Sequence, residues 1–336
     1  MKKTTIKDIA QKLEVSPSTV SRALSNHPDI SDILKQKIQE TARILKYRPS
    51  SAALHLKQGT SKSIALILPQ ITSFFYPSVI HGIEEVLHSQ GYMLVILPTN
   101  DLYEREKENI NIAYDQNVDG VLIAVSKETP DTDHFEILNE SDIPVIMLDK
   151  VIENAKCTTI TIDDFKVSYQ MVQHLYKSGC RKIIGIFGKA SLSISHLRYK
   201  GFEQALRDLN LECTETMVSF VNNTTEAKEN GLALLKEHKP DGLYVMTDEI
   251  MLGVMSSIAK LKLRVPEDIS ILAISDGYLP QFMLPSVSHL KHDGYELGMI
   301  SAQKMIQYIN AKNNNLTHNI EKIMLNTNIV LMKSTK

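Results

Sequence analysis

The sequence has few of the residues that cross-link small secreted domains or hold metals. Its 336 residues include three cysteines, Cys157, Cys180 and Cys213, which are widely spaced and form no CxxC pair. An odd number of separated cysteines argues against a disulfide framework and against a zinc site. We therefore expect a cytoplasmic protein, kept in a reducing compartment, without a bound metal.

Long apolar runs and cofactor loops are also missing. Uninterrupted apolar stretches such as Ile64 to Leu68 are far too short to cross a bilayer, so no membrane span is expected. The chain begins Met-Lys-Lys but continues directly into a polar amphipathic segment, which is not the pattern of a signal peptide. No GxGxxG or GxxxxGK[ST] sequence occurs, so we expect no nucleotide cofactor.

Positive charge is concentrated at the N-terminal end. The whole chain has 37 Lys and Arg against 39 Asp and Glu, a net charge of −2. Its first 60 residues contain 11 Lys and Arg against 5 Asp and Glu, so this stretch is net +6 and the remainder is net −8. A basic segment on an acidic body is typical of a local phosphate-binding module.

Three short helices are predicted in the basic segment. Apolar residues at helical spacing predict a first helix over 6–13, and Ser16 followed by Pro17 is a typical start of a second helix. A third helix is expected from Ser31. Two short helices joined by a tight turn, with a third closing the core, form a helix-turn-helix unit. A plain helical bundle with a solvated face is the alternative.

The outward face of the second helix suits the major groove of DNA. Pro17, Ser18 and Ser21 are short, so the helix can lie deep in the groove. Arg22 is long enough to donate in bidentate fashion to O6 and N7 of a guanine.

The same segment resembles the N-terminal domain of the lactose-repressor (LacI/GalR) family. The likeness is carried by Thr5-Ile-Lys-Asp-Ile-Ala, Val15-Ser-Pro-Ser-Thr-Val-Ser-Arg22 and Leu45-Lys-Tyr-Arg-Pro49, and Ser50-Ser-Ala-Ala-Leu-His-Leu56 is similar to the hinge helix of that family. Leu34 departs from the pattern, because many relatives have a phosphate-contacting Thr there. The resemblance implies DNA contacts at Thr5, Ser16, Pro17, Ser18, Ser21, Arg22, Asn26, Ala53, Leu56 and Lys57.

The segment after the three helices is expected to connect them to a larger domain. We assign 1–48 to the helix-turn-helix domain and 49–62 to a hinge helix and linker. The resemblance implies that the hinge orders against DNA and that Leu56 wedges between base steps in the minor groove. A plain linker is the alternative.

From residue 63 onward, short apolar runs alternate with amphipathic helical patterns, which predicts two parallel sheets with helices on both faces. The expected strands are Ile64–Leu68, Met93–Leu97, Val121–Val125, Val145–Leu148, Thr158–Ile162, Lys182–Phe187, Met217–Val221, Leu243–Met246, Ile269–Ile274 and one near Ile323–Leu331. The expected helices include Ser78–Gln90, Phe165–Ser178, Ser195–Leu209, Ala227–Glu237, Ile250–Leu261 and Glu296–Ala311.

The family resemblance implies that this α/β region is a two-lobed, periplasmic-binding-protein-like domain. Its chain would cross between the lobes three times. The first lobe would hold about 63–160 and 292–320, and the second about 161–291 and 321–336. No leucine heptad follows residue 331, so a homodimer is the expected assembly.

Polar and aromatic side chains follow the predicted strands, where two facing lobes would enclose a ligand. The candidate ligand-binding residues are Phe75, Tyr76, Ser126, Asp149, Ser193, Arg198, Thr247, Asp248, Ser275 and Asp276. Hydroxyls, carboxylates, one Arg and an aromatic pair suit a sugar or a sugar derivative. Alternatively, Asp149 and Asp276 cap helices, Phe75 belongs to the core, and Arg198 pairs with an acid across the cleft. Four histidines, His81, His174, His289 and His292, show no metal-ligand spacing and are expected to be structural or at the surface.

These observations favour a DNA-binding transcriptional regulator, usually a repressor, whose affinity for a near-palindromic operator is set by a small effector. Two alternatives are a regulator controlled by a protein partner and a cytoplasmic solute-binding protein. An enzyme is disfavoured, because no nucleophile–base pair, metal cluster or cofactor loop is visible in the sequence.

Overall fold

The structure is a computed structural model that describes residues 4–47, 60–72, 74–152, 154–317 and 319–336. The chain forms two compact units, Met1–Ser61 and Lys62–Lys336, which are described separately. The predicted hinge residues Ala53, Leu56 and Lys57 lie outside the described residues.

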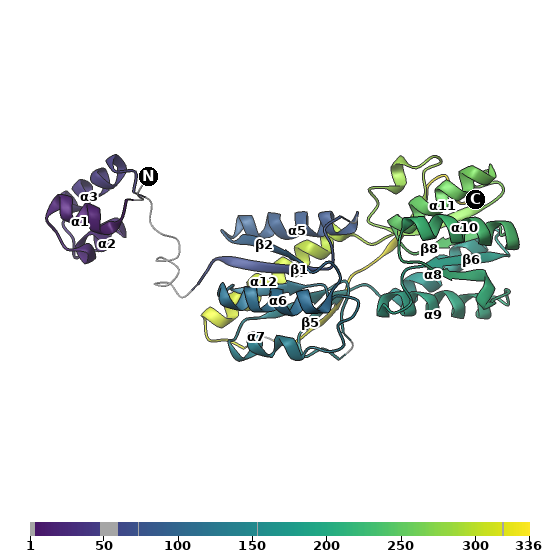
Figure 1. The fold of residues 1–336 in the computed structure, drawn as a ribbon, viewed down its shortest axis with the longest axis horizontal. Coiled ribbons are helices and arrows are strands. Elements are labelled where there is room, and N and C mark those ends of the chain that lie inside the picture. Colours follow the sequence, from purple (N-terminus) through teal and green to yellow (C-terminus); the bar gives the residue numbers. More distant parts are fainter. Residues whose placement is uncertain (1–3, 48–59, 73, 153, 318) are drawn as a thin grey trace. The chain divides into compact units, whose positions relative to one another are not determined.

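The first unit is a three-helix domain (Figure 1). Its helices are α1 (Ile6–Leu13), α2 (Pro17–Leu24) and α3 (Asp32–Ile44). Ile9, Val20, Ala23 and Ile38 from the three helices form its buried core. The three predicted helices are therefore confirmed.

The starts of α1 and α2 follow from their capping residues. At α1, the Thr5 amide and hydroxyl both donate to the Asp8 carboxylate at 2.7 Å. At α2, the Ser16 hydroxyl accepts from the Thr19 amide at 3.1 Å. These contacts satisfy backbone donors that have no partner inside a helix.

The second unit has two lobes, each built on a six-stranded sheet. The first sheet is fully parallel, in the order β11-β5-β4-β3-β1-β2. Its strands are β1 (Ser63–Leu68), β2 (Met93–Pro98), β3 (Gly120–Ile123), β4 (Val145–Leu148), β5 (Thr158–Thr161) and β11 (Lys322–Met324). Its helices are α5 (Phe75–Ser89), α6 (Tyr103–Asp115), α7 (Glu136–Glu140) and α12 (Gly294–Asn313).

The second sheet has the order β12-β10-β9-β8-β6-β7. Its strands are β6 (Ile183–Phe187), β7 (Val218–Phe220), β8 (Gly242–Val245), β9 (Ser270–Ser275), β10 (Ser288–Lys291) and β12 (Asn328–Val330). Its helices are α8 (Asp164–Lys177), α9 (Ser193–Asp208), α10 (Thr224–His238) and α11 (Asp248–Leu261). Short 3-10 turns occur at Asp133–Phe135, Glu215–Met217 and Pro280–Phe282.

Strand β1 shows why the apolar runs are continuous. Ile64, Leu66 and Leu68 belong to the core cluster that includes residues of α5 and α12, whereas Ala65 and Ile67 belong to the cluster that includes residues of α6. Each face of the sheet is covered by helices, so both sets of side chains are buried.

The C-terminal segment corrects two predictions. The strand expected at Ile323–Leu331 is two strands, because Asn326-Thr327 interrupts it: β11 pairs with β5 in the first sheet and β12 pairs with β10 in the second. The third crossing between the lobes therefore follows β11, not residue 320. Strand β10 was not predicted, and its pairing with β12 is antiparallel, so the second sheet is not purely parallel.

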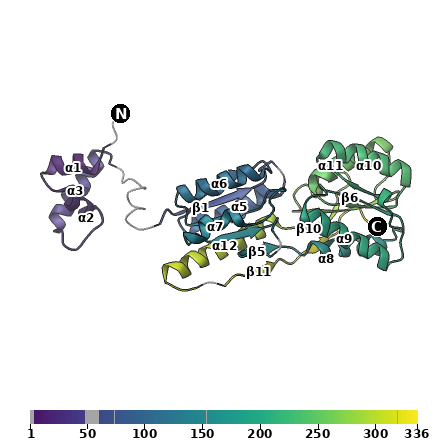
Figure 2. The same ribbon diagram turned by 60° about the horizontal axis from the view of Figure 1, so that its bottom comes forward.

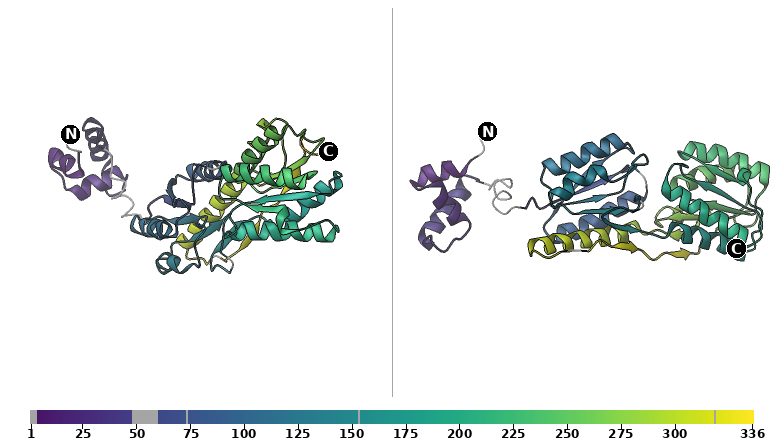
Figure 3. Two further views of the ribbon diagram at one scale, coloured as in Figure 1. Left: turned by 45° about the vertical axis from the view of Figure 1, so that its right-hand side comes forward. Right: turned by 90° about the horizontal axis from the view of Figure 1, so that it is seen from below.

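Helix α12 packs closely against α5 in the first lobe. It follows β10 of the second lobe and lies along the first lobe (Figures 2 and 3). A Cβ atom on Gly82 of α5 would lie 2.2 Å from the Tyr295 carbonyl oxygen, and one on Gly298 would lie 2.2 Å from that of Val79. Glycine at both positions lets the two helix backbones touch.

Candidate functional site

The exposed face of α2 carries the residues expected to read DNA. Pro17, Ser18 and Arg22 are exposed, and Ser21 is half-buried. Asn26 follows the helix with a positive φ of 53°, and its side-chain oxygen accepts from the Gln39 amide at 2.9 Å. The helix therefore presents short side chains around one long cation, which is the shape that a major groove accepts.

Three further positions in this unit have structural roles. Thr5 and Ser16 use their hydroxyls for the helix caps described above. Leu34 is half-buried and packs against the helix-turn-helix core. Its side chain thus stabilises the unit.

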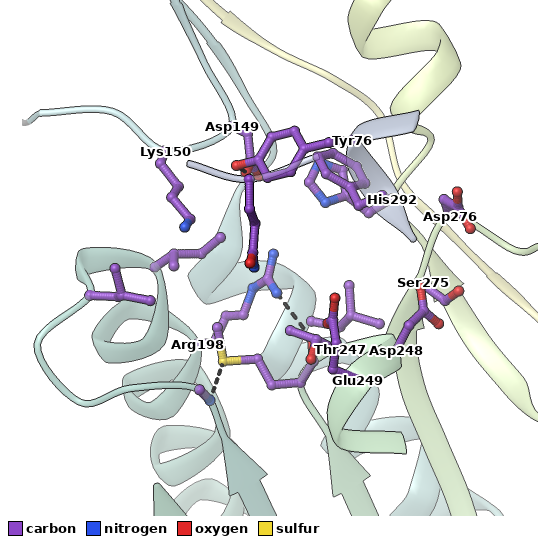
Figure 4. Close-up of a pocket in the computed structure, with 17 residues that line it drawn as sticks. Tyr76, Asp149, Lys150, Arg198, Thr247, Asp248, Glu249, Ser275, Asp276 and His292 are labelled. Atoms are coloured by element: carbon purple, nitrogen blue, oxygen red, sulfur yellow. Dashed lines mark hydrogen bonds between the residues drawn. The ribbon is translucent and has the colours of Figure 1, made fainter. Parts of the chain in front are cut away.

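A cavity of about 170 Å³ lies between the two lobes, at the carboxyl ends of their strands (Figure 4). A cavity of this size holds several water molecules or one small ligand. The cavity is lined by Gln70, Phe75, Tyr76, Asp149, Lys150, Gly188, Leu192, Ile194, Arg198, Met246, Thr247, Asp248, Glu249, Ile274, Ser275, Asp276 and His292.

The first lobe contributes an aromatic wall. Helix α5 begins at Phe75, three residues earlier than predicted, so Phe75 and Tyr76 lie in its first turn. The Tyr76 hydroxyl donates to the Asp149 carboxylate at 2.9 Å. The pKa of Tyr76 is raised, mainly because the ring is buried and also because the negative charge of Asp149 lies close by. The Phe75 ring lies 4.3 Å from the His292 ring, centroid to centroid. Asp149 thus orients Tyr76.

The second lobe contributes a buried ion pair. Arg198 is 3% exposed, its Nε donates to the Asp164 carboxylate at 2.7 Å, and its Nη1 donates to the Met246 carbonyl at 3.1 Å. Burial raises the pKa of Asp164 to about 6, with Arg198 opposing the shift. Arg198 therefore does pair with an acid, but Asp164 belongs to the same lobe, so the expectation of an acid across the cleft was wrong.

A second carboxylate of this lobe has an unsatisfied oxygen. Thr247 caps α11 by accepting from the Ile250 amide at 3.4 Å, and Asp248 follows it. Asp248 is 5% exposed, and its Oδ1 atom has no hydrogen-bond partner. Burial raises its pKa to about 7, with the Ser275 hydroxyl opposing the shift and Asp276 adding to it.

A hydrogen bond connects the two lobes directly beside the cavity. The Ser78 hydroxyl of α5 donates to the Asp276 carboxylate, which follows β9, at 2.7 Å. The same carboxylate accepts from the Tyr278 amide at 3.0 Å. Asp276 therefore orders its own turn and holds the other lobe.

Eight of the ten predicted ligand-binding residues line the cavity, and Ser126 and Ser193 do not. Ser126 is buried, and its hydroxyl donates to that of Thr99 at 2.9 Å. Ser193 is an exposed residue at the start of α9. Both predictions of a place at the cavity were wrong, because position near a strand or helix end does not fix the direction of a side chain.

The sequence reasoning missed several lining residues, of which His292 is the most informative. His292 directly follows β10, the strand that was not predicted. It is 5% exposed, its Nε2 atom has no hydrogen-bond partner, and burial lowers its pKa to about 4. Recognising β10 would have placed His292 at a strand end with the other candidates.

The described residues include neither a candidate membrane span nor a cluster of metal-ligating side chains. No described helix combines the length and apolar character needed to span a membrane. No group of three or more His, Cys, Asp or Glu side chains within the described part of the chain could hold a metal ion.

Comparisons with known proteins agree with this architecture. Residues 5–50 match the family described as bacterial regulatory proteins of the lacI family, and residues 61–327 match the periplasmic binding proteins and sugar binding domain of the LacI family. The match of residues 61–327 covers most of the chain, and it agrees with the observed two-lobed fold.

Similar proteins are transcriptional regulators, not enzymes. The regulator RegA of Clostridium saccharobutylicum is 26% identical over 314 residues, 92% of this chain and 93% of that protein. The repressor CytR of Escherichia coli K12 is 29% identical over 296 residues, 88% of this chain and 86% of that protein. The fold matches that of a lac repressor dimer bound to operator and anti-inducer with a TM-score of 0.86, at 21% identity and 99% coverage of both chains. The chain belongs to the LacI family of bacterial regulatory proteins.

Proposed function

We propose that this protein is a repressor that binds a near-palindromic operator as a homodimer and responds to a sugar or a sugar derivative in the cavity between its lobes. The observation that carries the proposal is the composition of the cavity wall. Side chains from both lobes line one cavity, so the affinity for a ligand depends on how the lobes are arranged.

The coupling between ligand and DNA has a physical source in this arrangement. A ligand that bridges the lobes favours one arrangement over another, and this differential affinity is the free energy available to change operator binding. The Ser78–Asp276 hydrogen bond is a lobe-to-lobe contact that this rearrangement would make or break. Couplings of about 1–3 kcal/mol change operator affinity roughly 5- to 150-fold.

The operator is read by α2 in this proposal. Arg22 supplies base contacts, while Lys residues of the basic unit contact phosphates. Two copies related by two-fold symmetry double the contacts of one small helix-turn-helix unit, which supports a dimer on a palindromic site. The operator-bound dimer found for the lac repressor supports the same assembly.

Operator selection from random DNA tests the role of Arg22. We expect Arg22→Ala to lose about 1–3 kcal/mol on the best operator and to relax one base position in each half-site. Arg43→Ala, on the exposed surface of α3, is the matched control and should leave the selected motif unchanged. An unchanged motif with Arg22→Ala would contradict the assignment.

The effector response is tested by removing the buried ion pair as a unit. Arg198→Ala alone would leave Asp164 buried and unpaired, so the better variant combines Arg198→Met with Asp164→Leu. We expect this double variant to bind operator without ligand as the parent does and to lose its response to sugars. A retained response would place the regulatory site elsewhere.

A further inference from the structure

The charged side chains of the cavity indicate what kind of ligand it takes. Four carboxylates and two cations line it. The carboxylates are Asp149, Asp248, Glu249 and Asp276, and the cations are Lys150 and Arg198. An anionic ligand would therefore need at least one of the two cations to be available.

Both cations are already paired with acids that do not line the cavity. Arg198 contacts the Asp164 carboxylate at 2.7 Å, and the Lys150 ammonium lies 3.9 Å from the Asp101 carboxylate. A phosphate or carboxylate ligand would have to compete with these neighbours while also lying close to the four lining carboxylates. Like charges that face each other in a partly desolvated site oppose binding.

The remaining N–H groups of Arg198 can still form hydrogen bonds. A guanidinium has five donors, and the contacts with Asp164 and Met246 use two of them. Figure 4 shows the guanidinium directed into the cavity. Since Asp164 balances its charge, Arg198 is suited to donate to a neutral hydroxyl or ring oxygen.

The lining carboxylates differ in what they can still accept. Asp149 accepts from Tyr76, and Asp276 accepts from Ser78 and Tyr278. Asp248 is 5% exposed and has one oxygen without a partner, which is an unusual state for a buried carboxylate. It is therefore the acceptor in this wall that gains most from a new donor.

His292 offers a complementary unsatisfied atom. It is 5% exposed with its Nε2 atom unpartnered, and it directly follows β10, which lies between β12 and β9 in the second sheet. A hydroxyl group can donate to a carboxylate and can also donate to or accept from a neutral imidazole. Several adjacent hydroxyls on one ring would form hydrogen bonds with both Asp248 Oδ1 and His292 Nε2.

We propose that the cavity selects a polyhydroxylated ligand without negative charge, a neutral or amino sugar, and that Asp248 is the residue that anchors it and rejects anionic derivatives. This inference rests on the proposed effector role of the cavity and narrows the ligand class within it. A hydroxyl or ammonium group of the ligand donates to Asp248 Oδ1, and sugar acids and sugar phosphates are excluded by the surrounding carboxylates.

The test is a charge-matched ligand series measured by calorimetry and thermal shift. For each of several pentoses and hexoses, the neutral sugar, the 2-amino sugar, the uronate and the phosphate are titrated into the full-length dimer. We expect binding by a neutral or amino member and affinity at least about tenfold weaker for the anionic members of the same series. Tighter binding by the anionic members overturns the inference and leaves the proposed effector role intact. If no member binds, both are overturned.

Asp248→Asn then tests the anchor. The substitution keeps the shape and removes the charge, so we expect about tenfold weaker binding of the identified sugar. The substitution should weaken the binding of an amino sugar more than that of the neutral sugar. Asp208→Asn, on the exposed surface of α9, is the matched control and should bind as the parent does.

Thermal stability separates an anchor from a residue that stabilises the fold. Because Asp248 is buried with an unsatisfied oxygen, we expect ligand-free Asp248→Asn to melt at the same temperature as the parent or higher at pH 8. A lower melting temperature together with unchanged sugar affinity would overturn the role of Asp248 as the anchor.

Discussion

The two walls of the cavity come from lobes of similar architecture but differ in how their polar groups are satisfied. In the first wall, Tyr76 and Asp149 satisfy each other, and Phe75 packs against His292. In the second wall, Arg198 and Asp164 form a buried ion pair, and Asp248 has an unsatisfied oxygen. The first wall is suited to provide shape, while the second holds charge that a ligand or a change of pH can alter.

The largest expected effect comes from breaking the ion pair of the second wall. Asp164→Asn should lower the free energy of unfolding by about 3–5 kcal/mol, because Arg198 is left buried without a counter-charge. Chemical denaturation measures the change. Asp163→Asn is the control: Asp163 caps α8 through the Lys166 amide, and Asn caps equally well, so little change is expected. If both variants lost the same small amount of unfolding free energy, the Arg198–Asp164 ion pair would not be what stabilises the second wall.

A smaller effect should appear in the pH dependence of stability at Asp248. Its pKa in the folded protein is raised to about 7, above the ordinary value of 3.8, so the folded state holds a proton that the unfolded state has released. Its contribution is therefore favourable at low pH and is lost as the pH rises from about 4 to about 7.

The difference between Asp248→Asn and the parent isolates this contribution from those of the other charged and ionisable side chains nearby. These groups are Asp149, Arg198, Glu249, Asp276 and His292. As the pH rises from 5 to 8, we expect the free energy of unfolding of the variant to increase by on the order of 2 kcal/mol relative to that of the parent. Denaturation at each pH measures this difference. A constant difference across this range would contradict the raised pKa.

The first wall should respond least. Tyr76→Phe removes the hydrogen bond to Asp149, and the half-buried carboxylate can be hydrated in its place. We expect a loss of about 1 kcal/mol in the free energy of unfolding, without a change in its pH dependence between pH 5 and pH 8. If Tyr76→Phe lowered the free energy of unfolding as much as Asp164→Asn, the two walls would not differ in how strongly their polar contacts stabilise the fold.

The sequence predicted the helix starts and the buried strands, because these depend on residues that are close together in the chain. Thr5, Ser16 and Pro17 mark helix starts through contacts within four residues, and runs such as Val145–Leu148 are apolar because both faces of the sheet are covered. The family resemblance added the two lobes and the three crossings. Most candidate ligand residues were found because strand ends in parallel sheets meet at one edge.

Features that depend on distant partners were missed. Strand β10 reads Ser288-His-Leu-Lys291, too polar to be recognised, and it is a strand because β9 and β12 pair with its two edges. The pairing of Arg198 with Asp164 joins residues 34 positions apart. Ser126 follows a predicted strand as its neighbours do, but its hydroxyl faces Thr99 in the interior.

The crossing of the chain between the lobes also affects the order in which the protein can fold during synthesis. The helix-turn-helix unit has all its helices once Ile44 has been made. The first lobe lacks α12 and β11 until residue 324 has been made, and the second lacks β12 until residue 330. Strand β5 is complete at Thr161, and at about 5–20 residues per second the interval between residues 161 and 324 lasts roughly 8–33 s. During this interval the edge of β5 that later pairs with β11 is open, so the nascent first lobe exposes an unpaired strand edge.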